Sequence, residues 1–418
     1  MLGRSVLDWP TGVTVYKTEK CYNGYTVVTP FVSPHIYLVD MMGRVVHHWE
    51  IRTDPPLYAE ILERQVDGSW LGVLWRDPAK LQETEKARSQ AIGVAAFAQC
   101  AVVDLDPDGN IVWRWDAPEN FWPHHDVRRL KNGNTLLLLN TFVDKPKIAK
   151  KPVVDQYFRE ITPGGEIVWE WRTSDHFDEF GFSKEAKQLM YERGGDVFHN
   201  NTATVIPGNR LGAKDPRFRK GNILGSQRHT SVIYIIDRES GEVVWKWGDG
   251  KDQLVGQHHP TMLDNGNILI YDNGGRSGYP TKTRFHTRLV EIDPATCEIV
   301  WEYRHEPNRR KETCKFLSLS WGSTQRLPNG NTFSLDCHKG RLFEVTPDGE
   351  IVWEYISPFP WGSWSKIETG IYRAFRYGYD EVPFVGDPWF MRTDGHKGVA
   401  VVKPELPEGL GLPSKDPA

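Results

Sequence analysis

The fold is decided by the stretch Asp106-Pro107-Asp108-Gly109-Asn110-Ile111-Val112-Trp113, because the chain returns to this phrase again and again. Each copy is a turn, two β-branched or aliphatic residues and then tryptophan; the other copies end at Trp49, Trp169, Trp245, Trp301 and Trp353. Proline restricts φ and glycine supplies the positive φ of a tight hairpin. We interpret each copy as the outer hairpin of one β-propeller blade, whose tryptophan fills the gap to the next blade.

A second phrase, Leu-x-Asn-Gly-Asn followed by an apolar strand, alternates with the first. Clear copies occupy residues 130–134, 263–267 and 327–331, and weaker copies occupy 65–69 and 205–209. Asn-Gly between two apolar runs is a strong hairpin signal. We interpret these copies as the inner hairpins, and the two phrases together predict five complete blades.

The sixth blade is expected to combine both ends of the chain. Residues 25–51 supply three strands that end in an outer hairpin, and residues 371–377 can supply the missing inner strand. Such closure removes exposed sheet edges. The prediction is an all-β, six-bladed β-propeller closed by N- and C-terminal strands, with short helical insertions at 78–96 and 175–193. It forms a single domain over 1–418, with blades at about 20–385 and a wrapping tail at about 387–418. The second insertion is a candidate lid.

Composition argues against several classes of partner. The chain has 51 basic and 55 acidic residues, a net charge of −4, so neither nucleic acid nor a membrane surface is expected. No segment approaches the roughly 18 apolar residues of a membrane span, and no signal peptide is seen, although a leader could have been trimmed. Five cysteines without CxxC spacing favour reduced thiols and a cytoplasmic location. The expected partner is a small aromatic or anionic substrate, and the oligomeric state is left open.

Counting back from the inner turns predicts a polar ring at the channel mouth. The residues eight positions before the turn glycines are Glu60, His125, Asn200, His258 and Gly322, and their neighbours include His124, His199, Asn201 and His259. Equivalent positions of a symmetric scaffold face one axis, so we expect a histidine-rich site there. The alternative is that these polar side chains simply line a wet channel.

Two arginines and a further histidine follow strands of the later blades. Arg228 ends one strand, and Arg276 follows Asn273 and two glycines. The guanidinium fork suits sulfate, phosphate or carboxylate oxygens, and the glycines let backbone N–H groups approach an anion. The alternative for each arginine is a surface salt bridge. His338 is a candidate nucleophile or a supporting residue, and its alternative is a polar loop end.

The order of these motifs resembles bacterial arylsulfate sulfotransferases. The matching segments are 196–201 (DVFHNN), 226–230 (SQRHT), 257–258 (QH) and 271–276 (YDNGGR), and the likeness extends over roughly residues 20–380. The resemblance implies a six-bladed propeller that transfers a sulfuryl group between phenols through a sulfohistidine, without the nucleotide donor PAPS and without a cofactor. It implies that His199, His258 and Arg276 contact the sulfuryl oxygens and that His338 is the nucleophile.

If this resemblance holds, His338 attacks sulfur and the two other histidines with Arg276 stabilise charge on the oxygens. One of those histidines protonates the departing phenolate. Residues expected to help bind the substrate are Arg228, Asn201, His125, His259, Asn273 and Trp321.

Two other functions compete with sulfuryl transfer. His125, His199 and His258, with Glu60 nearby, form a plausible divalent-metal site of a lyase or hydrolase. His125 distinguishes these hypotheses, because sulfuryl transfer assigns it no chemical role. The third hypothesis is a propeller that binds a ligand at its mouth without catalysis.

Overall fold

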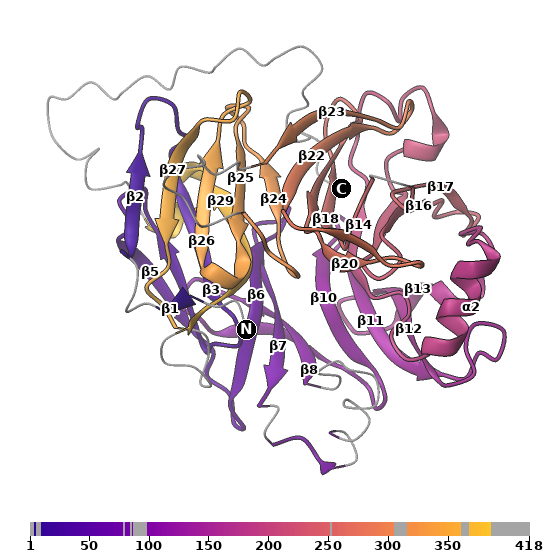
Figure 1. The fold of residues 1–418 in the computed structure, drawn as a ribbon. Helices are drawn as coiled ribbons and strands as arrows, with labels where there is room; N and C mark the ends of the chain where they lie inside the picture. The colour runs from indigo at the N-terminus through magenta and orange to yellow at the C-terminus, as the bar shows by residue number, and fades with distance from the viewer. Residues whose placement is uncertain are drawn as a thin grey trace, which may run out of the picture.

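The computed structural model describes residues 4–5, 10–77, 80–83, 86, 98–250, 253–304, 316–360 and 368–385. Within these residues the chain forms six antiparallel sheets arranged as the blades of a propeller (Figure 1). The prediction of a six-bladed, all-β fold is confirmed. The predicted tail and most of the first insertion, at 78–96, lie outside the described residues.

Each blade has four strands in the order inner to outer. Blade 1 is β29 (Ile371–Tyr377), β3 (Tyr25–Pro30), β4 (His35–Val39) and β5 (Val45–Glu50), and blade 2 is β6 (Leu57–Arg64), β7 (Trp70–Arg76), β8 (Gln99–Leu105) and β9 (Ile111–Asp116). Blade 3 is β10 (Trp122–Arg129), β11 (Thr135–Val143), β12 (Val153–Ile161) and β13 (Ile167–Arg172), and blade 4 is β14 (Asn200–Val205), β15 (Ile223–Gln227), β16 (Val232–Ile236) and β17 (Val243–Trp247). Blade 5 is β18 (His258–Met262), β19 (Ile268–Asp272), β22 (Arg288–Asp293) and β23 (Glu298–Tyr303), and blade 6 is β24 (Thr324–Arg326), β25 (Thr332–Asp336), β26 (Arg341–Val345) and β27 (Ile351–Ile356).

Strands from the two ends of the chain pair with one another in three places. Strand β29 pairs antiparallel with β3, from Ile371 opposite Pro30 to Tyr377 opposite Tyr25, which confirms the expected closure of blade 1. Strand β2 (Gly12–Tyr16) adds to the outer edge of β27, as Figure 1 shows, and was not anticipated. A short pair, β1 (Arg4–Ser5) with β28 (Glu368–Thr369), also joins the ends. This pairing covers strand edges that would otherwise be open.

Tryptophans of the outermost strands tie each blade to the next. Trp353 of blade 6 donates its indole N–H to the carbonyl of Met41 in blade 1, at 2.9 Å. The same bond recurs around the ring from Trp49 to Asp106, Trp113 to Pro163, Trp171 to Gly241, Trp245 to Pro294 and Trp301 to Pro347. The inter-blade role of the repeated tryptophan is therefore confirmed, except that in blade 3 it belongs to Trp171 and not to Trp169.

One of the two weaker copies of the inner phrase, at residues 205–209, does not form a hairpin turn. Gly68, Gly133, Gly266 and Gly330 all have positive φ and lie in tight inner hairpins. By contrast, the 205–209 copy lies where β14 leads into the longer connection 206–222, which contains the 3₁₀-helix Pro216–Phe218. Its Asn209 side chain accordingly bonds within that connection, to the carbonyls of Pro207 and Phe218.

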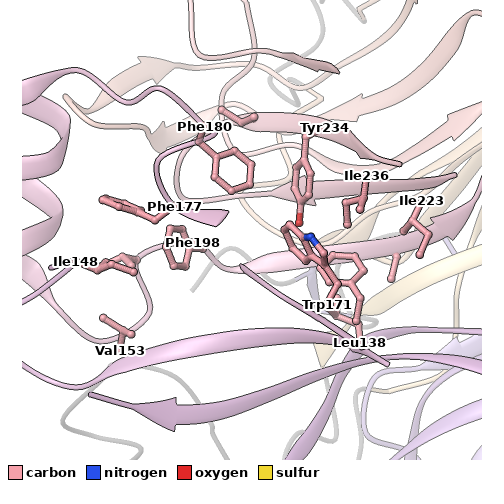
Figure 2. Packing of buried hydrophobic residues seen from close by; sticks show 14 of the residues in the cluster. Leu138, Ile148, Val153, Trp171, Phe177, Phe180, Phe198, Ile223, Tyr234 and Ile236 are labelled. Atoms are coloured by element: carbon pink, nitrogen blue, oxygen red, sulfur yellow. The ribbon is translucent and has the colours of Figure 1, made fainter. Parts of the chain in front are cut away.

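The second insertion is packed into the core. It comprises the 3₁₀-helix η2 (Thr173–His176) and the helix α2 (Lys184–Arg193), which the Ser183 hydroxyl caps. Figure 2 shows Phe177 and Phe180 of this insertion beside Phe198, in the cluster shared by blades 3 and 4. Buried apolar side chains therefore anchor the insertion to blades 3 and 4, just before His199 in the chain.

Cys21, Cys100, Cys297 and Cys337, the cysteines in the described part of the chain, form no disulfide. None of the described helices has the length and apolar character needed to cross a bilayer.

Two short strands, β20 (Gly275–Ser277) and β21 (Lys282–Arg284), form a hairpin between β19 and β22. The remaining 3₁₀-helices are Cys337–Lys339, Tyr379–Glu381 and Pro383–Val385.

Candidate functional site

Two kinds of segment meet at one end of the channel. The beginnings of the innermost strands bring His125, His258 and Tyr372, while the turns after the second strands bring Arg228 and His338. In an antiparallel blade a hairpin joins the end of the first strand to the start of the second. The start of the first strand and the end of the second therefore lie together at the opposite edge of the blade. The register shows this directly: His258 pairs with Tyr271, two residues before Asn273.

A β-bulge changes the direction of the side chains at these strand entries. The pairing of β10 with β11 shifts register between Pro123 and Val127, and His125 within it has φ +64°. His199, His259 and Trp321 adopt the same left-handed conformation. In a regular strand, successive side chains point to opposite faces. The bulge instead lets His124 and His125 lie together, with ring centroids 3.8 Å apart.

His125 is held by a buried carboxylate. Its Nδ1 lies 2.6 Å from Oε1 of Glu60, and Glu60 Oε2 accepts bonds from Trp75 and Gln99. Burial raises the pKa of Glu60. Burial also lowers the pKa of His125 well below its ordinary value, and the charges of His199 and Arg373 lower it further. The sequence placed Glu60 in the ring, and the structure makes it the partner of His125.

Three more histidines have an equally defined Nδ1 partner. His124 Nδ1 lies 2.7 Å from the carbonyl of Asn200, His199 Nδ1 bonds the carboxylate of Asp196, and His229 Nδ1 lies 2.7 Å from the carbonyl of Asp196. Burial would raise the pKa of Asp196, but the charge and hydrogen bond of His199 outweigh it and hold that pKa far below its usual range. Burial also lowers the pKa of His124 and His229.

His125 and His258 both contact the ring of Tyr372. Tyr372 stacks on His125 at a centroid distance of 4.7 Å and meets His258 edge-on at 6.5 Å. Asn273 donates through Nδ2 to two carbonyls, so its oxygen is the acceptor for His258 Nδ1 at 2.7 Å. The backbone N–H of Trp321 reaches His258 Nε2 at 3.3 Å. Burial lowers the pKa of His258 well below 6.5.

The two predicted arginines have different surroundings. Arg228 is partly exposed; its Nη2 donates to the Leu319 carbonyl at 3.0 Å, and its Nε is buried without a partner. Among the described residues no carboxylate forms an ion pair with it, and burial lowers its pKa. Arg276 is exposed on β20, although its neighbours Gly275 and Ser277 are buried. Of the two arginines, Arg228 is the more buried.

His338 lies in the turn after β25 and stacks on the indole of Trp321. Its Nδ1 and Nε2 lie 3.4 Å and 3.3 Å from the hydroxyls of Ser318 and Ser320. Burial, together with the charges of Lys339 and Arg228, lowers its pKa to about 4. The imidazole is therefore neutral at neutral pH.

Asn201 and His259 lie deeper in the channel than the histidine-rich mouth. The fully buried Arg373 bonds the Asn201 carbonyl and forms an ion pair with Asp126 at 2.9 Å. His259 lines a cavity of about 350 Å³ with Arg128 and Phe375. The other residues of this cavity include Arg64, Pro207, Leu263 and Tyr377, at the far ends of innermost strands. The structure thus separates these two predicted substrate residues from the mouth.

Two groups of described residues place potential metal-ligand atoms within 4.8 Å of one another: His124, His125 and His199, and Asp196, His199 and His229. His258, which the sequence grouped with His125 and His199, belongs to neither of them, and His124 takes its place.

Sequence reasoning missed Asp196, His229 and Tyr372 as parts of the site. Asp196 precedes His199 by three residues, a spacing that could have suggested the pair. His229 and His338 occupy the same position, the second residue after the second strand of their blades. Tyr372 gave no such signal, because its strand closes the ring with the N-terminus and has no inner turn from which to count.

A family model described as Arylsulfotransferase (ASST) matches residues 90–358, well over half of the chain. The chain belongs to the arylsulfotransferase family. The matched region of this arylsulfotransferase-family chain includes His124, His125, His199, Arg228, His258 and His338. Glu60 and Tyr372, which both contact or face these residues, come from outside it. An arylsulfotransferase-like activity is therefore supported in general terms.

No curated protein matches this family member. Among solved structures, a protein of unknown function from Bacteroides caccae is 14% identical, with 85% of this chain and 100% of that chain covered and a TM-score of 0.49. Virginiamycin B lyase from Staphylococcus aureus is 12% identical over 85% of this chain and 87% of that chain, with a TM-score of 0.40. The Dos1 propeller is 10% identical over 87% and 79%, with a TM-score of 0.39. Such distant likenesses carry no argument about function.

Proposed function

We propose that this chain transfers a sulfuryl group from an aryl sulfate to an acceptor phenol, without a nucleotide donor, through a covalent intermediate on His338. The observation that carries the proposal is a neutral imidazole beside an arginine that has no carboxylate partner among the described residues. A neutral imidazole has the lone pair needed to attack sulfur. A partly buried guanidinium without a counter-ion favours an anionic group such as a sulfate ester.

In the first step, a ring nitrogen of His338 forms a bond to sulfur while the bond between sulfur and the donor's aryl oxygen breaks. The phenolate leaves with the electron pair. Arg228 donates hydrogen bonds to the sulfuryl oxygens, where negative charge gathers in the transition state. The indole of Trp321, stacked on His338 and 4.3 Å from the ring of Phe31, offers an apolar surface to the aromatic donor.

In the second step, the acceptor oxygen forms a bond to sulfur, the bond from sulfur to His338 breaks, and the phenol proton passes to a base. We assign this base to His258 because its lowered pKa keeps it neutral and its Nε2 takes only a long bond from Trp321. The sequence-based hypothesis gave a histidine the opposite role, protonating the leaving phenolate. A neutral His258 whose N–H is bonded to Asn273 suits a base better, so donors that leave as stable phenolates should react fastest.

The test is release of nitrophenolate from 4-nitrophenyl sulfate with phenol as acceptor. We expect turnover by the wild type and none by His338→Asn, while His48→Asn, on the exposed outer strand β5, turns over normally. Mass spectrometry of protein quenched with donor alone should locate a sulfuryl adduct on His338. Wild-type protein that releases no nitrophenolate, or a His338→Asn variant as active as the wild type, overturns the proposal.

A further inference from the structure

We propose that the Nε2 atoms of His124, His125 and His199 bind one divalent metal ion of the zinc class at the channel mouth. This inference goes beyond the proposed sulfuryl transfer, since it uses neither His338 nor Arg228. The ligand atoms of the three histidines all lie within 4.8 Å of one another. Their ring centroids are separated by 3.8, 4.9 and 5.7 Å. Two adjacent blades supply the three rings.

The hydrogen bonds assign the tautomer of each ring. The nearest partners of the Nδ1 atoms are the Asn200 carbonyl, the Glu60 carboxylate and the Asp196 carboxylate, all of which accept. Gln99 Nε2, at 3.5 Å from His125 Nδ1, makes its short bond to Glu60 instead. In its neutral form each imidazole has a single N–H, so Nδ1 donates and Nε2 keeps the lone pair with which it binds a metal ion in place of a second proton. No described residue donates a hydrogen bond to any of these three Nε2 atoms. Three histidines with ligand nitrogens this close, each with an acceptor at Nδ1, fit the arrangement that metal-binding histidines adopt.

The backbone conformation brings these rings together. His125 and His199 both have positive φ, at +64° and +56°, a conformation that costs energy for any residue other than glycine. The bulge around His125 turns it and His124 to one side, which regular strand alternation would prevent.

The donor set indicates which ion is bound. Three imidazole nitrogens suit zinc and its neighbours in the transition series, whereas magnesium and calcium prefer oxygen. The buried carboxylates of Glu60 and Asp196 place negative charge behind two of the ligands and so compensate the charge of the ion. Asp196 already accepts the N–H of His199, so in the second group, with His229, it orients a ligand rather than binding the ion. Three protein ligands leave a position open on a tetrahedral ion.

The experiment is a metal titration of the chelator-treated full-length protein. We expect the wild type to bind one equivalent of Co²⁺ with a visible spectrum typical of four-coordinate geometry, and Zn²⁺ to displace it. His125→Ala should lower the affinity for Zn²⁺ by about two orders of magnitude or more. Glu60→Gln, which loses only the carboxylate charge behind the ring, should lower it by about 10- to 100-fold. His258→Ala and the distant control His286→Ala should bind Zn²⁺ as the wild type does.

Several outcomes would overturn the proposal. One is wild-type protein that shows no saturable binding of Co²⁺ or Zn²⁺. Another is a His258→Ala variant that loses binding as completely as His125→Ala, because the ligands would then be different. Circular dichroism identifies any variant that fails to fold, and the wild-type cobalt titration decides the question without a variant.

Discussion

The imidazole of His338 lies parallel to the indole of Trp321, with ring centroids 4.7 Å apart and an interplanar angle of 10°. The indole covers one face of the imidazole, and burial is the main reason that the pKa of His338 falls from 6.5 to about 4. Because the unprotonated ring is the nucleophile, activity is retained above this pKa and lost as the pH falls through it. We therefore expect kcat/KM to be level across neutral pH and to decline near pH 4.

Removing the indole should move that decline. In Trp321→Leu, the exposed imidazole regains a pKa closer to 6.5, so the acid limb of the kcat/KM profile shifts to higher pH. A matched variant, Trp115→Leu on the outermost strand β9, should leave the limb in place. An unchanged limb in Trp321→Leu would show that the indole does not set the pKa of the nucleophile.

Replacing the two arginines in turn distinguishes their roles. We expect Arg228→Gln to lower kcat/KM by about 100- to 1000-fold, the usual cost of removing a donor that stabilises a developing anion. Arg276→Gln should have a much smaller effect, because Arg276 is exposed on β20. The measurement is steady-state turnover of 4-nitrophenyl sulfate. Losses of equal size would support instead the role for Arg276 that the family resemblance implies.

Tyr372 offers a test of substrate contact that is separate from stability. Its side chain is fully buried, burial raises its pKa, and its hydroxyl has no hydrogen-bond partner. Tyr372→Phe should change the free energy of unfolding by less than about 0.5 kcal/mol, since no hydrogen bond is lost. It should raise KM, because we expect the bound substrate to supply the partner that this buried hydroxyl lacks. The control is Tyr271→Phe, which removes a 2.7 Å bond to the Leu335 carbonyl and should cost about 1–3 kcal/mol in urea unfolding. An unaltered KM in Tyr372→Phe would remove this residue from the binding site.

The junction between blades 6 and 1 should be sensitive to loss of one indole N–H. Trp353→Phe leaves the Met41 carbonyl without its donor in a buried interface, and we expect a loss of about 1–3 kcal/mol in the free energy of unfolding. Trp113→Phe removes the equivalent bond to Pro163, where water can replace the donor, and should cost less than about 1 kcal/mol. Urea unfolding measures both, and equal losses would contradict the idea that burial makes the difference.

Most of the fold was readable from local chemistry. Turn residues and the tryptophan after each apolar pair depend on neighbours a few positions away, so their recurrence predicted the blades and the strand that closes the ring. The exceptions show the limits of that reasoning. Trp169 and Trp171 both fit the pattern, and only the register of β13 placed Trp171 against blade 4. Nothing in residues 12–16 marked them as an additional strand on the outer edge of blade 6.

For the site, the sequence alone determined which blades contribute histidines and that they gather at one channel mouth, because the inner turns set the distance along each strand. Only the tertiary structure decided which rings meet. The register shift near the start of β10 lets His124 join His125 and His199, while His258 bonds Asn273. The tertiary structure likewise decided which arginine is exposed, since the exposure of Arg276 depends on how the hairpin of β20 and β21 packs on the blade. Strand alternation is a local rule, but the bulges that break it are stabilised by contacts between blades far apart in the chain.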